Sequence, residues 1–207
     1  MPEYLAPGVY IEEVPTNAHP IDGVPTSNAA FIDIFQQGPL NKALKMSSFA
    51  EFERTFGGLH ACSEASYAIR QYYLNGGGVA WVARVDDASA EQLIGDAAAQ
   101  TGMHALEGIA PDSFNILCIP AAANLDHQSF AAVISAAEKY CRDKRAFLIV
   151  DPPPTIKTKD EMVDWMQTND GLRDRNAAIY FPRLEIPDPL NAGSSRNVVH
   201  RSVSNQK

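Results

Sequence analysis

A few residues of this sequence have types and neighbours that could carry out chemistry. Cys118 lies in the apolar segment NILCIP, and His127 follows it closely enough in the chain to serve as its general base. A thiol among apolar neighbours is more often inert, because the reactive thiolate needs a polar or positively charged environment. Asp151 follows the apolar segment AFLIV, and α/β enzymes place catalytic groups at such strand ends. The three prolines directly after Asp151 favour a structural turn instead.

Motifs typical of other active sites are absent from the sequence. The five histidines show no zinc-ligand spacing such as H-E-x-x-H, and no G-x-S-x-G elbow presents a serine nucleophile. The glycine run 76–78 lies between an expected helix and an expected strand, the reverse of the strand-to-helix order that binds phosphate. We therefore expect no catalytic residue, no cofactor and no metal. The alternative left open is a small α/β enzyme with a site near Asp151 or Cys118.

The overall charge argues against a nucleic-acid partner. The 207 residues carry 25 acidic and 17 basic side chains, a formal net charge of -8, whereas a phosphate backbone favours clustered Lys and Arg. Hydrophobic residues make up 45% of the chain, which is enough for a core, but no apolar run is long enough to cross a bilayer. The three cysteines are widely spaced and form no Cys-x-x-Cys pair. We expect a soluble chain with reduced thiols that neither binds nucleic acid directly nor inserts into a membrane.

The elements that would position any site begin with a strand that stands apart from the rest. In LAPGVYIEEVP, the residues Val9, Tyr10, Ile11 and Val14 favour an extended strand, and prolines on both sides isolate it. The segment TNAHPIDGVPTSN that follows is rich in Pro, Gly, Asn and Thr, so it has little to bury. We expect residues 1–25 to form an extended arm and a linker.

Residues 26–190 alternate between strand and helix patterns, which predicts an α/β fold. The part from 114 to 186 follows a β-α-β-α-β order, the order of parallel strands joined by right-handed crossovers, and a smaller α/β portion precedes it. Two subdomains, at about 26–100 and 101–190, are compatible with this order. The expected strands are AAFIDIF (29–35), VAWVARV (79–85), FNILCIP (114–120), AFLIVD (146–151) and AAIYFPRLEI (177–186).

Helices are expected at 48–56, 63–75, 126–145 and 158–170, with shorter helical pieces between 89 and 108. Ser48 with Glu51, and Thr158 with Glu161, have the capping-box spacing, and Asp126 can cap the third helix. The last turns of that third helix collect basic residues against the negative end of its dipole. The apolar side chains expected to be buried on the fourth helix are Met162, Val163, Trp165 and Met166.

Two further expectations concern single places in the chain. Asp33 lies inside the first strand of the α/β region, so it must face solvent or find a partner. Beyond Leu190 the composition becomes polar and basic, and residues 191–207 are expected to be disordered or unrelated to the rest of the fold.

Five segments in the same order carry a resemblance to a known family. They are PGVYIEEV, QQGPLNKALKMSSFAEFERTFGG, YAIRQYYLNGGGVAWVARV, IGDAAAQTGMHALEGI and FNILCIPA. Together they resemble contractile-tail sheath proteins, which build the outer tube of bacteriophage contractile tails, pyocin-like particles and contractile injection systems. The resemblance runs from about Tyr4 to Leu190.

The resemblance implies a structural subunit rather than an enzyme. Sheath subunits polymerise helically around an inner tube and meet baseplate or terminator proteins, and contraction of a metastable tube drives the inner tube through a membrane. It implies assembly in the bacterial cytoplasm and a place in a virion tail or contractile particle. In sheaths the amino-terminal arm adds a strand to a sheet of a neighbouring subunit. The residues that would make this contact are Gly8, Val9, Tyr10, Ile11, Glu12, Glu13 and Val14.

The resemblance also has a departure. Family members continue past the position of Leu190 into a part that completes the core domain, contacts the inner tube, and supplies the receiving sheet and a second arm. We therefore expect an apparently truncated sheath subunit that does not build contractile tubes alone. The alternative is a short sheath-like assembly or capping factor.

Overall fold

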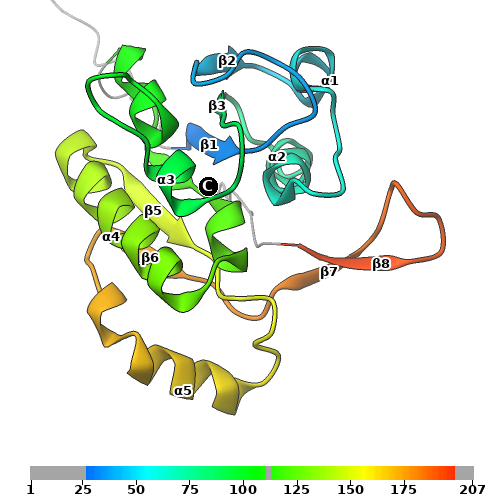
Figure 1. Ribbon diagram of the computed structural model, residues 1–207. Coiled ribbons are helices and arrows are strands. Elements are labelled where there is room, and N and C mark those ends of the chain that lie inside the picture. Colours follow the sequence, from blue (N-terminus) through cyan, green and yellow to red (C-terminus); the bar gives the residue numbers. More distant parts are fainter. Residues whose placement is uncertain (1–26, 111–112, 199–207) are drawn as a thin grey trace, which may run out of the picture.

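A parallel sheet forms the centre of the computed structural model, which describes residues 27–110 and 113–198 (Figure 1). The sheet has six strands in the order β2-β3-β1-β4-β5-β6. All neighbouring pairs are parallel except β2, which runs antiparallel to β3. The strands are β1 (Ala29–Asp33), β2 (Leu44–Met46), β3 (Ala80–Arg84), β4 (Ile116–Cys118), β5 (Phe147–Val150) and β6 (Ala177–Ile179). The predicted α/β class with a mainly parallel sheet is confirmed, and the sheet joins strands from both 26–100 and 101–190.

Helices lie on both faces of this sheet. They are α1 (Phe49–Phe56), α2 (Glu64–Leu74), α3 (Ala90–Ile94), α4 (His127–Lys144) and α5 (Lys159–Thr168), with the 3-10 helices η1 (Gly102–Gly108), η2 (Pro120–Asn124) and η3 (Asp170–Leu172). Three of them begin at the capping residues that the sequence predicts, although Glu51 accepts from the Ser47 amide, so the predicted capping box at α1 is incomplete. The side chains of Ser48 and Asp126 accept hydrogen bonds from the first-turn amides of α1 and α4. Thr158 and Glu161 form a complete capping box at α5.

The strands divide their side chains between two cores, because successive residues point to opposite faces. On β1, Ala30 and Ile32 belong to a cluster with α3, η1 and α4. Ala29 and Phe31 belong to a second cluster, which is rich in aromatic rings from α1 and α2. In that second cluster Phe52 packs against Phe35 at 5.3 Å between ring centroids. Burial on both faces explains why the central strands are almost continuously apolar.

The segment AAIYFPRLEI is not the single strand that was predicted. β6 ends at Ile179, and residues Leu184–Pro187 form β7 in a separate two-stranded sheet. Pro182 has no N–H to donate to a ladder, so it interrupts strand pairing between the two parts. β7 pairs antiparallel with β8 (Ser195–Val198). Residues 191–207 were expected to be disordered or unrelated to the rest of the fold; of these, residues 195–198 are ordered as β8, where Val198 is 3% exposed.

The helix α5 is correctly placed, but the predicted burial of its apolar side is wrong. Val163 is 44% exposed, and Met162, Trp165 and Met166 are only half-buried. The helix connects β5 to β6, at the end of the sheet, so it has less of the body to pack against (Figure 1). Its main aromatic contact is Trp165 against Phe130 of α4, at 5.7 Å between centroids.

Candidate functional site

The residues predicted to join subunits, Gly8 to Val14, lie outside the described residues. Their contact with a neighbour therefore stays a prediction. The other candidates, Cys118 and Asp151, are described, as are the two edges of the main sheet at which a parallel α/β fold can bind partners or ligands.

Asp33 ends β1 at the carboxyl edge of the sheet, where the chain order reverses between β1 and β4. Its side chain is fully buried and accepts three hydrogen bonds: from the Ile34 amide at 2.7 Å, the Ala65 amide at 2.8 Å and the Ser63 hydroxyl at 3.3 Å. Burial raises the pKa of Asp33 from 3.8 to about 7, although the amides of Ala65 and Ile34 oppose this rise. Of the two predicted outcomes for Asp33, exposure to solvent or a partner, the structure shows a partner at the amino end of α2. This end of α2 occupies the place where related folds bind ligands.

Cys118 ends β4 at the same edge, and its surroundings are those of a packed thiol. It has no exposed surface and belongs to the cluster under α1 and α2. His127, its suggested base, begins α4, which packs on the opposite face of the sheet, and its side chain is exposed. The structure therefore does not bring this pair together as a nucleophile and base.

Asp151 lies at the carboxyl end of β5, and it is 5% exposed. The turn that follows is held by Arg183, whose Nε donates to the Pro152 carbonyl at 3.1 Å. The Nη1 atom of Arg183 also donates to both carboxylate oxygens of Glu64, at 3.0 and 3.2 Å. Glu64 in turn accepts from Asn124 of η2 at 3.1 Å. These bonds tie the segment before β7 to α2 and η2, so the turn at Asp151 has a structural explanation.

The carboxyl edge is consequently filled by helix ends and turns. Among the best-defined hollows of the described residues, none is lined by Asp33, Cys118 or Asp151. Within residues 27–110 and 113–198, no group of His, Cys, Asp and Glu has the geometry to hold a metal ion. In the same part of the chain no helix has the length and apolar character needed to cross a membrane.

The β7–β8 hairpin extends from the body beneath α2 (Figure 1). Its base is anchored by Tyr67, whose hydroxyl donates to Asp188 at 3.2 Å. The Arg196 guanidinium lies 4.3 Å from the centre of the Tyr67 ring and donates to the Ala61 carbonyl at 2.7 Å. Since its sheet contains only β7 and β8, each strand has one open backbone edge within the described residues. An open edge can accept a further strand.

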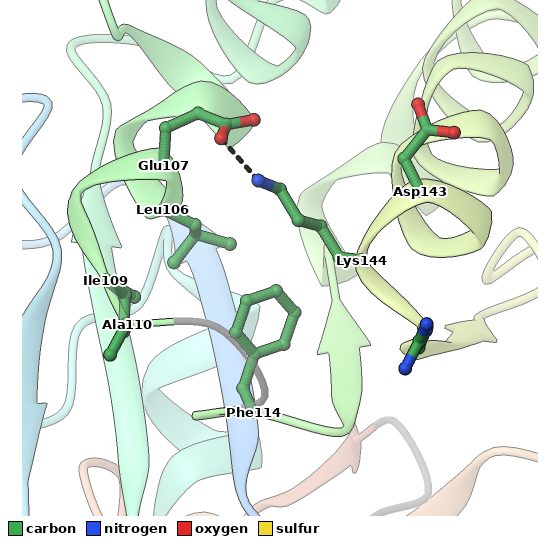
Figure 2. A pocket seen from close by; sticks show the side chains of 8 residues that line it. Leu106, Glu107, Ile109, Ala110, Phe114, Asp143 and Lys144 are labelled. Carbon is green, nitrogen blue, oxygen red and sulfur yellow. Dashed lines mark hydrogen bonds and ion pairs between the residues drawn. The ribbon is translucent and has the colours of Figure 1, made fainter.

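The amino edge of the sheet is hollowed at two adjoining places. Figure 2 shows the first, a pocket of about 530 Å³ in which Glu107 of η1 and Lys144 of α4 form an ion pair across the opening, with Phe114 on its floor. The second adjoins it through Arg145 and is lined by Arg142, Arg145, Arg175 and Phe147, among others. This surface was not predicted from the sequence: the run KYCRDKR concentrates positive charge, but the basic end of α4 was expected only to oppose the helix dipole.

Together these features define an α/β protein of flavodoxin-like strand order with exposed polar edges. Helix ends and turns occupy the place between β1 and β4 where the strand order reverses. Comparison with protein-family models finds no match, and neither does a search of curated proteins. Solved structures do match. A chain of the helical sheath of the anti-feeding prophage in its contracted state is 21% identical, with a TM-score of 0.59, over 95% of this chain and 49% of that one.

Two further solved structures agree with this match. A chain of the contracted sheath complex of the extracellular contractile injection system PVC is 18% identical, with a TM-score of 0.56, over 88% of this chain and 45% of that one. A chain of the contracted baseplate of the anti-feeding prophage is 18% identical, with a TM-score of 0.60, over 92% and 50%. The protein thus has the fold of contractile sheath proteins, and it spans about half the length of the chains it matches.

Proposed function

We propose that this protein is a structural subunit of a contractile sheath, in a phage tail or a contractile injection system. The observation that carries the proposal is the match of nearly the whole described fold to chains of contracted sheaths. The filled carboxyl edge supports a role without catalysis, since Cys118 and Asp151 are both explained by packing and turn formation.

The proposed link between subunits is strand addition by the amino-terminal arm. Residues Gly8–Val14 have strand-forming side chains between prolines, and main-chain hydrogen bonds can join such a segment to any open sheet edge. The β7–β8 hairpin supports the proposal, because it offers two open edges at the surface of the described residues. The partners in this proposal are other sheath subunits, the inner tube, and baseplate or terminator proteins.

This chain matches only about half of each sheath chain, which affects what assemblies it can form by itself. The sheath chains it matches contain about as much again outside the matched part. We propose that the chain alone forms oligomers but no ordered contractile tube. Electron microscopy of the purified chain tests this directly, since striated tubes would refute it. Selective binding to the end of a full-length sheath would favour a capping role instead.

Sedimentation velocity over a range of concentrations tests the arm. We expect the intact chain to associate and the chain without residues 1–15 to associate more weakly. A sharper pair of variants is Ile11→Pro and Asn17→Pro. Proline removes a ladder N–H, so Ile11→Pro should act like the deletion, whereas the same substitution in the linker should leave association unchanged. If all four proteins sediment alike, strand addition by this arm is wrong.

A further inference from the structure

The basic residues are unevenly distributed along this chain, which its net charge of -8 does not show. From residue 85 to residue 138 there is no Lys or Arg, and then Lys139, Arg142, Lys144 and Arg145 follow within seven residues. In a parallel sheet all strands begin at one edge and end at the other. The basic run precedes β5 and therefore lies at the amino edge of the sheet.

The second hollow of the amino edge, which we call the arginine hollow, has a volume of about 350 Å³. It is lined by Asn115, Arg142, Arg145, Ala146, Phe147, Arg175 and Asn176. Arg142 forms an ion pair with Asp174, but no ion pair is recorded for Arg145 or Arg175 within the described part of the chain. Asp174 also interacts electrostatically with Arg175, so three arginines share one carboxylate and the rim of the hollow keeps an excess of positive charge.

Two further groups in the arginine hollow lack a partner. The Oδ1 atom of Asn115 is buried without a hydrogen-bond partner among the described residues, and a buried polar atom of this kind is costly. Phe147 leaves 37% of its surface exposed. A peptide segment with a carboxylate could pair with the exposed arginines, and its side chains could cover the Phe147 ring.

The opposite, carboxyl edge has the complementary charge. Asp86 and Asp87 are adjacent and exposed in the turn that follows β3, and Glu91 is exposed in the first turn of α3. No Lys or Arg occurs within the fifty positions that follow Arg84, so no basic residue that follows closely in the sequence neutralises this turn. The turn is short and held in place by the hydrogen bond from the Ser89 amide to Asp87, at 2.8 Å.

We propose that the arginine hollow of one subunit receives the Asp86–Asp87 turn of a second copy of this chain. Guanidinium groups bind carboxylates bidentately, so Arg145 and Arg175 fit two adjacent aspartates. Because the two surfaces lie at opposite edges of one sheet, the contact is heterologous and can repeat from copy to copy into a helical filament. The inference rests on the proposed function and names a contact of the polymer that does not involve the arm.

Two charge reversals and their mixture test this contact. The variant Arg145→Glu/Arg175→Glu removes the basic surface, and the variant Asp86→Arg/Asp87→Arg removes the acidic surface. Each variant alone should therefore lose the contact between the arginine hollow and the Asp86–Asp87 turn, called the edge contact below. Mixed in equal amounts, the acidic turn of the first variant can bind the basic hollow of the second, and the basic turn of the second can bind the acidic hollow of the first. Sedimentation velocity on chains without residues 1–15 should therefore show alternating co-assembly of the two variants, which neither variant forms alone. The quadruple variant should recover self-association, because the charges are exchanged rather than removed.

The expected loss of association and the choice of control variant both follow from the charges of the contact. Either reversal should weaken association about tenfold or more, and the wild-type contact should weaken as ionic strength rises from about 0.05 M to about 0.5 M. Lys157→Glu/Lys159→Glu makes the same change in net charge on exposed residues near α5 and should have no effect. An effect of this control equal to that of the arginine reversal would overturn the proposal, as would a mixture that stays monomeric.

All measurements are made with and without residues 1–15, which separates this inference from the proposed function. If the edge contact is right and the arm is not, the deletion leaves association unchanged while the charge reversals abolish it. If only the arm is right, the deletion abolishes association and the reversals do nothing. Binding of inorganic phosphate or single-stranded DNA to the arginine hollow, with no co-assembly in the mixture, would reassign the surface to another ligand.

Discussion

The buried carboxyl of Asp33 makes the stability of this protein depend on pH in a direction that can be measured. Substitution Asp33→Asn keeps the shape of the side chain and removes its titration. The wild-type group has a pKa of about 7 in the folded protein, because burial disfavours its charge, against 3.8 for an ordinary aspartate. Well below pH 3.8 it is protonated in both the folded and the unfolded state, and it contributes no penalty there.

The sign follows from proton binding. Between pH 4 and 7 the folded protein keeps the proton that the unfolded chain has lost, so rising pH favours unfolding. The stability present at low pH is thus lost as the pH rises through the folded pKa. A difference between 3.8 and about 7 corresponds to a loss of about 4 kcal/mol by pH 8. The asparagine variant should not show this loss.

Urea unfolding of both proteins from pH 4 to pH 8 measures the effect, and the quantity to compare is the difference in unfolding free energy. We expect that difference to shift by about 4 kcal/mol in favour of Asp33→Asn as the pH rises. Other titrating groups contribute equally to both proteins and cancel. Asp143→Asn, at an exposed position on α4, is the matched control and should track the wild type. A difference that is constant with pH would refute the reasoning.

Three further predictions concern packing and capping. Phe52→Ala should lower the unfolding free energy by about 3–5 kcal/mol in urea titrations, since Phe52 is fully buried among aromatic rings; a loss below about 1 kcal/mol would contradict this packing. A thiol reagent should modify Cys62 rapidly and Cys118 and Cys141 only after unfolding, because Cys62 alone is exposed and burial raises the pKa of Cys141 to about 12; fast modification of all three would be inconsistent with the core. Thr158→Ala should destabilise α5 by about 1 kcal/mol through loss of its cap, seen as faster amide exchange there, whereas unchanged exchange would argue against the capping box.

The periodic parts of the fold were predictable from sequence because their signals are local. α1 and α4 follow from capping residues and apolar spacing, and β1, β3, β4 and β5 follow from apolar runs. The strand β2 was missed, since its three residues at the edge of the sheet carry no periodic signal. The hairpin β7–β8 was missed because pairing between Glu185 and Asn197 is decided by contacts rather than by either segment alone.

The candidate site was less predictable, for a related reason. Asp33 could be identified as a residue that needs a partner, but its partners Ser63 and Ala65 lie about thirty residues away. Arg145 and Arg175 come together only when β5 and β6 pair, so no sequence spacing joins them. Surfaces built from several strand ends depend on topology, which the β-α-β-α-β order predicted only in part.

A high-resolution map of the oligomer formed by the intact chain would show how the amino-terminal arm joins subunits. We expect the backbone of Val9 to Val14 to be paired with a strand of a second copy, as an added strand at an open sheet edge. Density that shows this segment hydrogen-bonded within its own chain, in oligomers or in a monomer, would contradict it.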